Sequence, residues 1–219
     1  MAPKEVNRNV SMVNMQIDIT RFLSAREAEQ ERLLQPQQES GGECVAPTLF
    51  GDTTMKNELA CLVLVNGRNV EEGFGLAFRI IQENHLDGTA IFERAARLLI
   101  SARAVAQVER LVSCIQSCGY PGRYDTDTVV LAALQELVRS EDDKKDLDLL
   151  VKCLKKDVNK VEAYMLAGRL KTAYLLAVRQ NRTDHVRRIM ALAEAAGQES
   201  VRAICEKRLQ GVASSPSPQ

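Results

Sequence analysis

Residues 167–190 read AGRLKTAYLLAVRQNRTDHVRRIM, and apolar side chains recur at helical spacing on both sides of one short polar turn. The pattern predicts helices over residues 170–180 and 184–196. Ala173 and Ala177 are four residues apart, so they form a strip of small side chains that lets a neighbouring helix approach closely. Because the turn is so short, the two helices must pack antiparallel as a hairpin.

The same helical spacing continues through nearly all of the chain from Met55 onward. Further helices are predicted at residues 53–65, 69–84, 87–99, 104–119, 125–137, 143–154, 158–168 and 198–209. Hairpins that follow one another every 25–35 residues or so are typical of an α-solenoid, in which each hairpin buries one face against the next. We therefore predict an all-α fold, an α-solenoid of stacked antiparallel helical hairpins. An irregular helical bundle is the alternative, because the sequence repeat is weak.

Local signals mark several helix ends. Gly67 is predicted to supply a left-handed residue after the first helix of this series. Asn69 and Glu72 have the spacing of a capping box, and Asp87 is predicted to cap the next helix. The apolar run LACLVLV, residues 59–65, is strand-like in composition but continues the helical phase before it, so we interpret it as a buried helix.

Composition divides the chain into three parts. Residues 1–45 are predicted to hold an N-terminal helix, at 12–34, and a flexible linker, QPQQESGGE, at 35–43. Residues 46–210 form the predicted α-solenoid interaction domain. Residues 211–219, GVASSPSPQ, are predicted to be a disordered tail.

The charges of the whole chain balance, with 29 Lys and Arg against 29 Asp and Glu, which argues against a globally basic nucleic-acid binder. Residues 152–210, however, carry 13 basic and six acidic residues, an excess of seven positive charges. Such a region can face an acidic protein or an anionic membrane, or it can simply be solvated. The cations predicted to contact partners face outward on the last three helices: Arg169, Lys171, Arg179, Arg182, Arg187 and Arg188. Aromatic residues that could stack on bases are not interleaved with them.

Catalytic, cofactor and metal sites are not expected. Gly73 and Gly75 fall inside a predicted helix, and Phe78 stands where a dinucleotide-binding motif needs its third glycine. Close helix packing is the better explanation of these glycines. Cys114 and Cys118 share a helix face but lack the two further ligands that a structural zinc ion needs.

Other sequence signals point to a non-enzymatic protein of the cytosol. No nucleophile elbow is present, and no cysteine has a histidine nearby in sequence. The six scattered cysteines are typical of reduced, buried thiols. The amino terminus, MAPKEVNRNV, lacks the apolar core expected of a signal peptide, and the sequence contains no run of roughly 20 apolar residues that could span a membrane.

Four segments resemble the carboxy-terminal end of the spastizin family of large FYVE-zinc-finger proteins. They are APTLFGD at 46–52, NGRNVEEGFGLAFRIIQE at 66–83, LKTAYLLAVRQ at 170–180 and VRAICEKRL at 201–209. The similarity runs from about residue 17 to residue 209 in the same order, and VEEGFGLAFRI is its most distinctive part.

The resemblance implies a scaffold role. Members of this family act with spatacsin and the fifth adaptor complex at late endosomes and lysosomes, in lysosome reformation, autophagosome maturation and cytokinesis. A cytoplasmic location at those membranes follows, with the centrosome or midbody as a second place. The zinc finger of the family has no counterpart here, since adjacent histidines and paired cysteines are both missing. Binding of phosphatidylinositol 3-phosphate is therefore expected only if such a finger lies upstream in a longer protein.

Two alternative functions fit the same sequence. A vesicle coat or tethering solenoid of another lineage would have the same physics and a different partner. The basic carboxy-terminal third could instead bind an anionic membrane peripherally, and such electrostatic binding weakens as salt rises.

Overall fold

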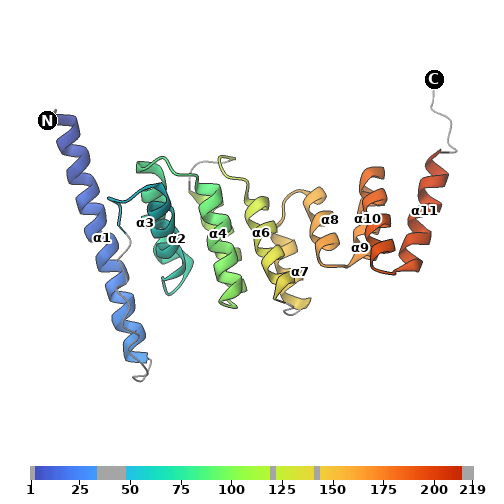
Figure 1. The fold of residues 1–219 in the computed structure, drawn as a ribbon, viewed down its shortest axis with the longest axis horizontal. Coiled ribbons are helices and arrows are strands. Elements are labelled where there is room, and N and C mark those ends of the chain that lie inside the picture. Colours follow the sequence, from blue (N-terminus) through green and yellow to red (C-terminus); the bar gives the residue numbers. More distant parts are fainter. Residues whose placement is uncertain (1–2, 34–47, 119–121, 141–143, 214–219) are drawn as a thin grey trace. The chain divides into compact units, whose positions relative to one another are not determined.

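The computed structural model describes residues 3–33, 48–118, 122–140 and 144–213. Within those ranges the chain forms eleven α-helices and no strands (Figure 1). The helices are α1 (Pro3–Leu33), α2 (Thr53–Val65), α3 (Val70–Glu83), α4 (Gly88–Ser101), α5 (Val105–Ser117), α6 (Thr126–Arg139), α7 (Lys144–Cys153), α8 (Asp157–Leu166), α9 (Leu170–Arg179), α10 (Thr183–Ala195) and α11 (Glu199–Ala213). The predicted all-α solenoid of helical hairpins is confirmed. The chain divides into two compact units, unit 1 (Met1–Asp125) and unit 2 (Thr126–Gln219).

The predicted helix ends are close to the observed ones, and the largest differences lie at the two ends of the chain. Helix α1 begins at Pro3, nine residues before the predicted start. Helix α11 continues to Ala213, so the first three residues of the predicted tail are helical. Residues 214–219 and the predicted linker at 35–43 lie outside the described residues. The boundaries proposed for the three parts of the chain stay a prediction.

Five helices end in the same way, which explains why the links are so short. Each turns through one residue with positive φ: His85, Arg103, Gly168, Asn181 and Gly197. At the end of α10 the N–H of Gly197 donates to the carbonyl of Glu194 at 3.2 Å, and the next N–H, of Gln198, donates to Ala193 at 2.8 Å. This is the Schellman motif, which satisfies the last helical carbonyls and reverses the chain within a few residues.

The helix starts confirm most of the predicted caps. Asn69 Oδ1 accepts the N–H of Glu72 at 3.0 Å, and Asp87 Oδ1 accepts the N–H of Ala90 at 3.2 Å. The return bond of the predicted capping box is shifted by one residue, because Glu72 Oε2 accepts the N–H of Arg68 at 2.8 Å. In each of the two helices the side chain of the N-cap residue therefore accepts one of the first N–H groups.

The predicted left-handed cap at Gly67 is wrong. The residue after α2, its C-cap Asn66, has a φ of −94°, and Gly67 is not among the residues with positive φ. Space explains the glycine instead, because an added Cβ would lie 2.5 Å from the carbonyl oxygen of Asn69.

In unit 1, both α2 and α5 pack on α3 and on α4. The strand-like run 59–65 is a buried part of α2, as predicted. Gly73 lets α3 approach α2, because an added Cβ would lie 2.0 Å from the carbonyl oxygen of Val63. Close packing thus explains Gly73, but not Gly75, where an added Cβ would meet open space. Helix α1 lies beside α2, with Met15 fully buried.

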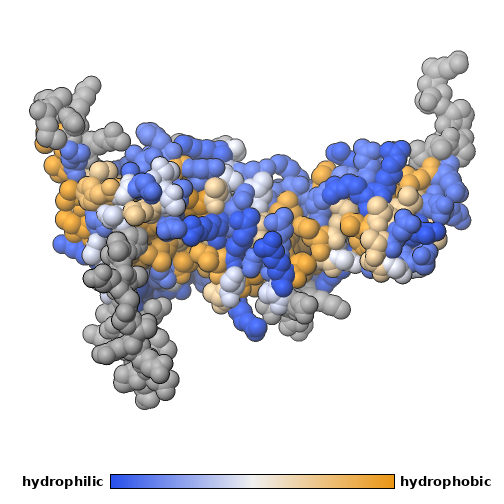
Figure 2. Space-filling model, viewed as in Figure 1, coloured by the Kyte–Doolittle hydropathy of each residue, from blue (hydrophilic) through white to orange (hydrophobic). Residues whose placement is uncertain are grey.

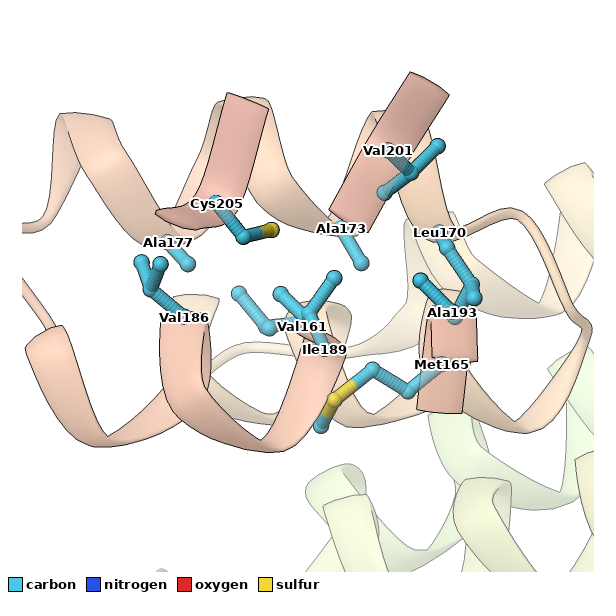
Figure 3. Close-up of a cluster of buried hydrophobic side chains, with 10 residues drawn as sticks. All are labelled: Val161, Met165, Leu170, Ala173, Ala177, Val186, Ile189, Ala193, Val201 and Cys205. Atoms are coloured by element: carbon cyan, nitrogen blue, oxygen red, sulfur yellow. The ribbon is translucent and has the colours of Figure 1, made fainter. Parts of the chain in front are cut away.

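In unit 2, α6 packs on α7 and α8, and α9 and α10 pack on each other and on both α8 and α11. The core of the last four helices consists of ten small or aliphatic residues (Figure 3): Val161, Met165, Leu170, Ala173, Ala177, Val186, Ile189, Ala193, Val201 and Cys205. Ala173 and Ala177 are both fully buried, so the predicted small-residue strip is confirmed. Small side chains at these positions allow neighbouring backbones to come close.

A buried carboxylate joins α6 to the start of α8. Asp127 is 1% exposed, and its two oxygens accept the backbone N–H groups of Lys155 and Lys156, each at 2.9 Å. The side-chain amide of Asn159 donates a third bond at 2.8 Å. The N-cap residue of α8, Lys156, gives the helix no side-chain cap. Asp127, 29 positions earlier in the chain, caps the start of α8 instead.

Candidate partner-binding surface

Helix α9 has one open face. It packs against α8, α10 and α11, and Ala173 and Ala177 point into the core. Lys171, Leu175 and Arg179 follow one another at four-residue intervals on the opposite face, and all three are exposed. Leu175 is 60% exposed, the highest value among the large apolar side chains of the described residues. The helix therefore presents a leucine between two cations.

Two cations on this face of α9 and one at the start of α10 are available for a partner. Lys171, Arg179 and Arg182 form no ion pair with any residue that the structure describes. Arg182 is the exposed N-cap residue of α10, three positions after Arg179. Together with Leu175, these three cations are called the α9 stripe below.

Arg179 has one longer-range acidic neighbour. Asp157, at the start of α8, has a lowered pKa, first because Lys160 donates a hydrogen bond to it at 2.8 Å. The charge of Arg179 lowers the pKa of this carboxylate further. No ion pair between Arg179 and a described residue accompanies this effect, and the side chain of Arg179 is exposed.

The other predicted contact residues are used within unit 2. Arg169 pairs with Asp148 of α7 at 2.6 Å, and its side chain is only 29% exposed. Arg187 pairs with Asp184, one turn earlier on α10, at 3.2 Å. Exposed pairs of this kind contribute only about 0–1 kcal/mol to stability, but they neutralise the cation that a partner would meet.

Arg188 belongs to a small polar cluster between α8 and α10. Both terminal nitrogens of Arg188 donate to the carboxylate of Glu162, and the Nη2–Oε2 bond is 2.9 Å long. This bond raises the pKa of Arg188. The buried ring of His185 lies against the same carboxylate, with Nε2 3.4 Å from Oε1, and no described residue bonds its Nδ1. The cluster ties two helices together and leaves Arg188 less free for a partner.

Sequence reasoning identified the cations of the α9 stripe and missed its apolar member. Leu175 sits in the run AYLLAV, which looks like core throughout. The available signal was its spacing of four residues from both Lys171 and Arg179, which places it on the charged side of the helix. Whether any of the six predicted residues contacts a partner stays a prediction.

No group of three or more His, Cys, Asp or Glu side chains in the described residues could hold a metal ion. Burial raises the pKa of Cys61 to about 11 and also raises the pKa of Cys205, which keeps both thiols protonated near neutral pH. Among the helices described, none is long and apolar enough to cross a membrane.

Stacked helical hairpins with exposed side chains along their outer faces define an α-helical repeat protein. The family model described as "ZFYVE26-like, TPR repeats" matches residues 87–210, which is more than half of the chain. The chain belongs to this family.

Several curated relatives share this similarity over nearly the whole chain. Zinc finger FYVE domain-containing protein 26 of Rattus norvegicus is 34% identical over 216 residues, and the human protein of that name is 32% identical over 212. The matches cover 95% of this chain but only 8% of each relative. A protein of Dictyostelium discoideum is 24% identical over 162 residues, 74% of this chain and 6% of its own length. No solved structure matches the chain significantly.

Proposed function

We propose that this chain is a protein-binding segment of a spastizin-like trafficking protein, and that it acts by binding rather than by catalysis. Its partners are a spatacsin-like protein and subunits of the fifth adaptor complex, on the cytoplasmic side of late endosomes and lysosomes. Its cellular roles are lysosome reformation, autophagosome maturation and cytokinesis. Membership of the family supports the proposal, although the chain spans only 8% of its first curated relatives.

The α9 stripe is the observation that carries this proposal. When a partner covers an exposed leucine, apolar surface is removed from water, and this burial favours binding by about 25 cal/mol per Å². Lys171 and Arg179 flank it at four residues on either side, and Arg182 follows three positions after Arg179 at the start of α10. None of the three forms an ion pair with a described residue, so they can complement an acidic surface without first breaking an internal ion pair. The stripe therefore fits a partner segment that places an apolar side chain between carboxylates.

Quantitative affinity purification of the tagged chain tests the proposal. The double variant Lys171→Glu and Arg179→Glu reverses the two cations that flank Leu175, and we expect recovery of the partner subunits to fall about tenfold or more. Leu175→Asp should have a similar effect. Because all three side chains are exposed, these variants should keep the fold, which circular dichroism checks.

Arg187→Glu is the matched control. Arg187 is also an exposed cation of unit 2, but it already pairs with Asp184. We expect this variant to recover the partners within about twofold of the original chain, as for a rim charge of little energetic weight. If the double variant recovered the partner subunits as well as the original chain does, the α9 stripe would not be the partner-binding surface.

Two other outcomes would redirect the proposal. Co-purification of tethering-complex or coat subunits, in place of adaptor subunits, would assign the chain to another trafficking lineage. Flotation with vesicles that contain anionic lipid, lost at high salt and absent with neutral vesicles, would indicate direct membrane binding through the same cations. The proposal predicts no flotation with either kind of vesicle.

A further inference from the structure

Helix α1 is apolar on two opposite faces. Met15 and Ile19 are fully buried on the face that packs within unit 1. On the other side of the helix four apolar side chains are 41–54% exposed: Val6, Val10, Val13 and Ile17. Figure 2 shows hydrophobic atoms gathered along the left edge of the molecule, where the first half of α1 lies in Figure 1. A helix that is apolar on both sides is typical of one that lies between two partners.

The spacing of the four exposed residues identifies the geometry of the missing partner. They are separated by four, three and four residues, which is the alternation of a and d positions in a heptad seam. Such a seam is narrower than the apolar face of a helix that packs on a globular core. Helices that lie on membranes have a broad apolar face bordered by Lys and Arg. Between Val6 and Ile17 the exposed residues at the flanking e and g positions are instead Asn7, Asn9 and Asn14, and the nearest exposed cation on this side, Arg21, lies one turn beyond Ile17.

We propose that this α1 seam, defined by Val6, Val10, Val13 and Ile17, pairs with the α1 seam of a second copy of the chain. The uncharged flanks support this occupant, because charges at flanking positions normally select a partner and two identical charged flanks would repel each other. With asparagines in these places, two copies meet without repulsion. The seam extends over only two heptads, so the pairing is concentration-dependent.

Sedimentation equilibrium of the full chain, from low to high micromolar concentration, measures this pairing. The test variant is Val10→Asn together with Val13→Asn, which makes the centre of the seam as polar as its flanks. Both valines are about half exposed, so the fold should survive, and circular dichroism verifies it. The original chain should show a monomer–dimer equilibrium, and the variant should raise its dissociation constant about tenfold or more.

Leu98→Asn is the matched control. Leu98 is an apolar side chain on α4, 43% exposed and outside the seam, so its replacement should leave the dissociation constant unchanged. A chain that stays monomeric over the whole concentration range would overturn the proposal. So would a dimer that persists in the double asparagine variant, or one that Leu98→Asn weakens equally.

Discussion

The two units use the same hairpin architecture but fill their cores differently. In unit 1, the rings of Phe74 and Phe92 lie stacked with centroids 5.8 Å apart, and Tyr124 meets Phe92 edge-on at 5.3 Å. In unit 2, the cluster around Ala173 and Ala177 contains no aromatic residue among its fully enclosed members. The comparison shows that the core of the same helical architecture can be filled either by aromatic rings or by small aliphatic side chains. Each solution is sensitive to a different kind of substitution.

Among the described glycines, Gly73 leaves the least room for a side chain, so its replacement should have the largest effect. Gly73→Ala would place a Cβ 2.0 Å from the carbonyl oxygen of Val63, and backbone atoms of two packed helices cannot move apart cheaply. We expect a loss of roughly 3–4 kcal/mol of stability. Hydrogen exchange should locate the loss in α2 and α3 and leave unit 2 protected.

Gly75→Ala provides the control on the same helix. An added Cβ at Gly75 meets open space, and alanine is the better helix former, so this variant should gain about 0.5–1 kcal/mol. If both substitutions changed stability by the same amount, backbone propensity rather than close packing would explain Gly73.

Asp127 provides the second test, now in unit 2. Asp127→Ala removes the three hydrogen bonds described above and takes the side-chain acceptor away from the partly buried N–H groups of Lys155 and Lys156. We expect a loss of about 3 kcal/mol, measured by urea unfolding with hydrogen exchange as the local probe. Asp148→Ala, which removes only an exposed ion pair, should cost less than about 1 kcal/mol. A smaller loss for Asp127→Ala than for Asp148→Ala would contradict this assignment.

The sequence predicted what depends on neighbours along the chain. Helix α2 begins and ends at the predicted residues, because its apolar spacing and the turn after it are local signals. The role of Asp127 could not be predicted from the sequence, because its carboxylate oxygens accept hydrogen bonds from residues 28 and 29 positions away. A capping carboxylate at that distance looks like any acidic residue in a first helical turn.

In the candidate surface, too, local features could be predicted from the sequence and long-range contacts could not. The excess of positive charge between residues 152 and 210 is visible in the sequence, and it led to six cations. Which of them are already paired depends on contacts between helices, such as the one from Arg169 to Asp148, 21 residues away. Sequence alone therefore located the region and could not separate the available cations from the paired ones.

Helix ends offer a third and smaller test. His85 in unit 1 and Gly197 in unit 2 occupy the same position of the Schellman motif, with φ of 53° and 65°. Glycine adopts this conformation without strain and other residues do not. His85→Gly should therefore stabilise unit 1 by about 1 kcal/mol, and Gly197→Ala should destabilise unit 2 by a similar amount. Thermal unfolding measures both, and equal signs would show that the backbone at one position differs from this description.

The last and smallest test compares the reactivity of buried and half-buried thiols and requires no change in stability. Cys61 is 2% exposed, and because its pKa is raised from 9.0 to about 11, its thiolate fraction at pH 8 falls about a hundredfold. In a Cys44→Ser background, a small alkylating reagent should modify half-buried Cys118 far faster than Cys61 or Cys205. The rate at Cys61 should keep rising with pH up to about 11. Equal rates in the folded chain would contradict the burial of Cys61 within α2.

Hydrogen–deuterium exchange of the chain, alone and with the purified partner, can show directly whether the partner covers α9. We expect partner binding to slow exchange in peptides that contain α9 and its link to α10, and to leave α2–α5 unchanged. The Lys171→Glu and Arg179→Glu variant should lose this added protection. Added protection confined to α2–α5, or retained in full by the variant, would contradict the assignment of the α9 stripe as the partner-binding surface.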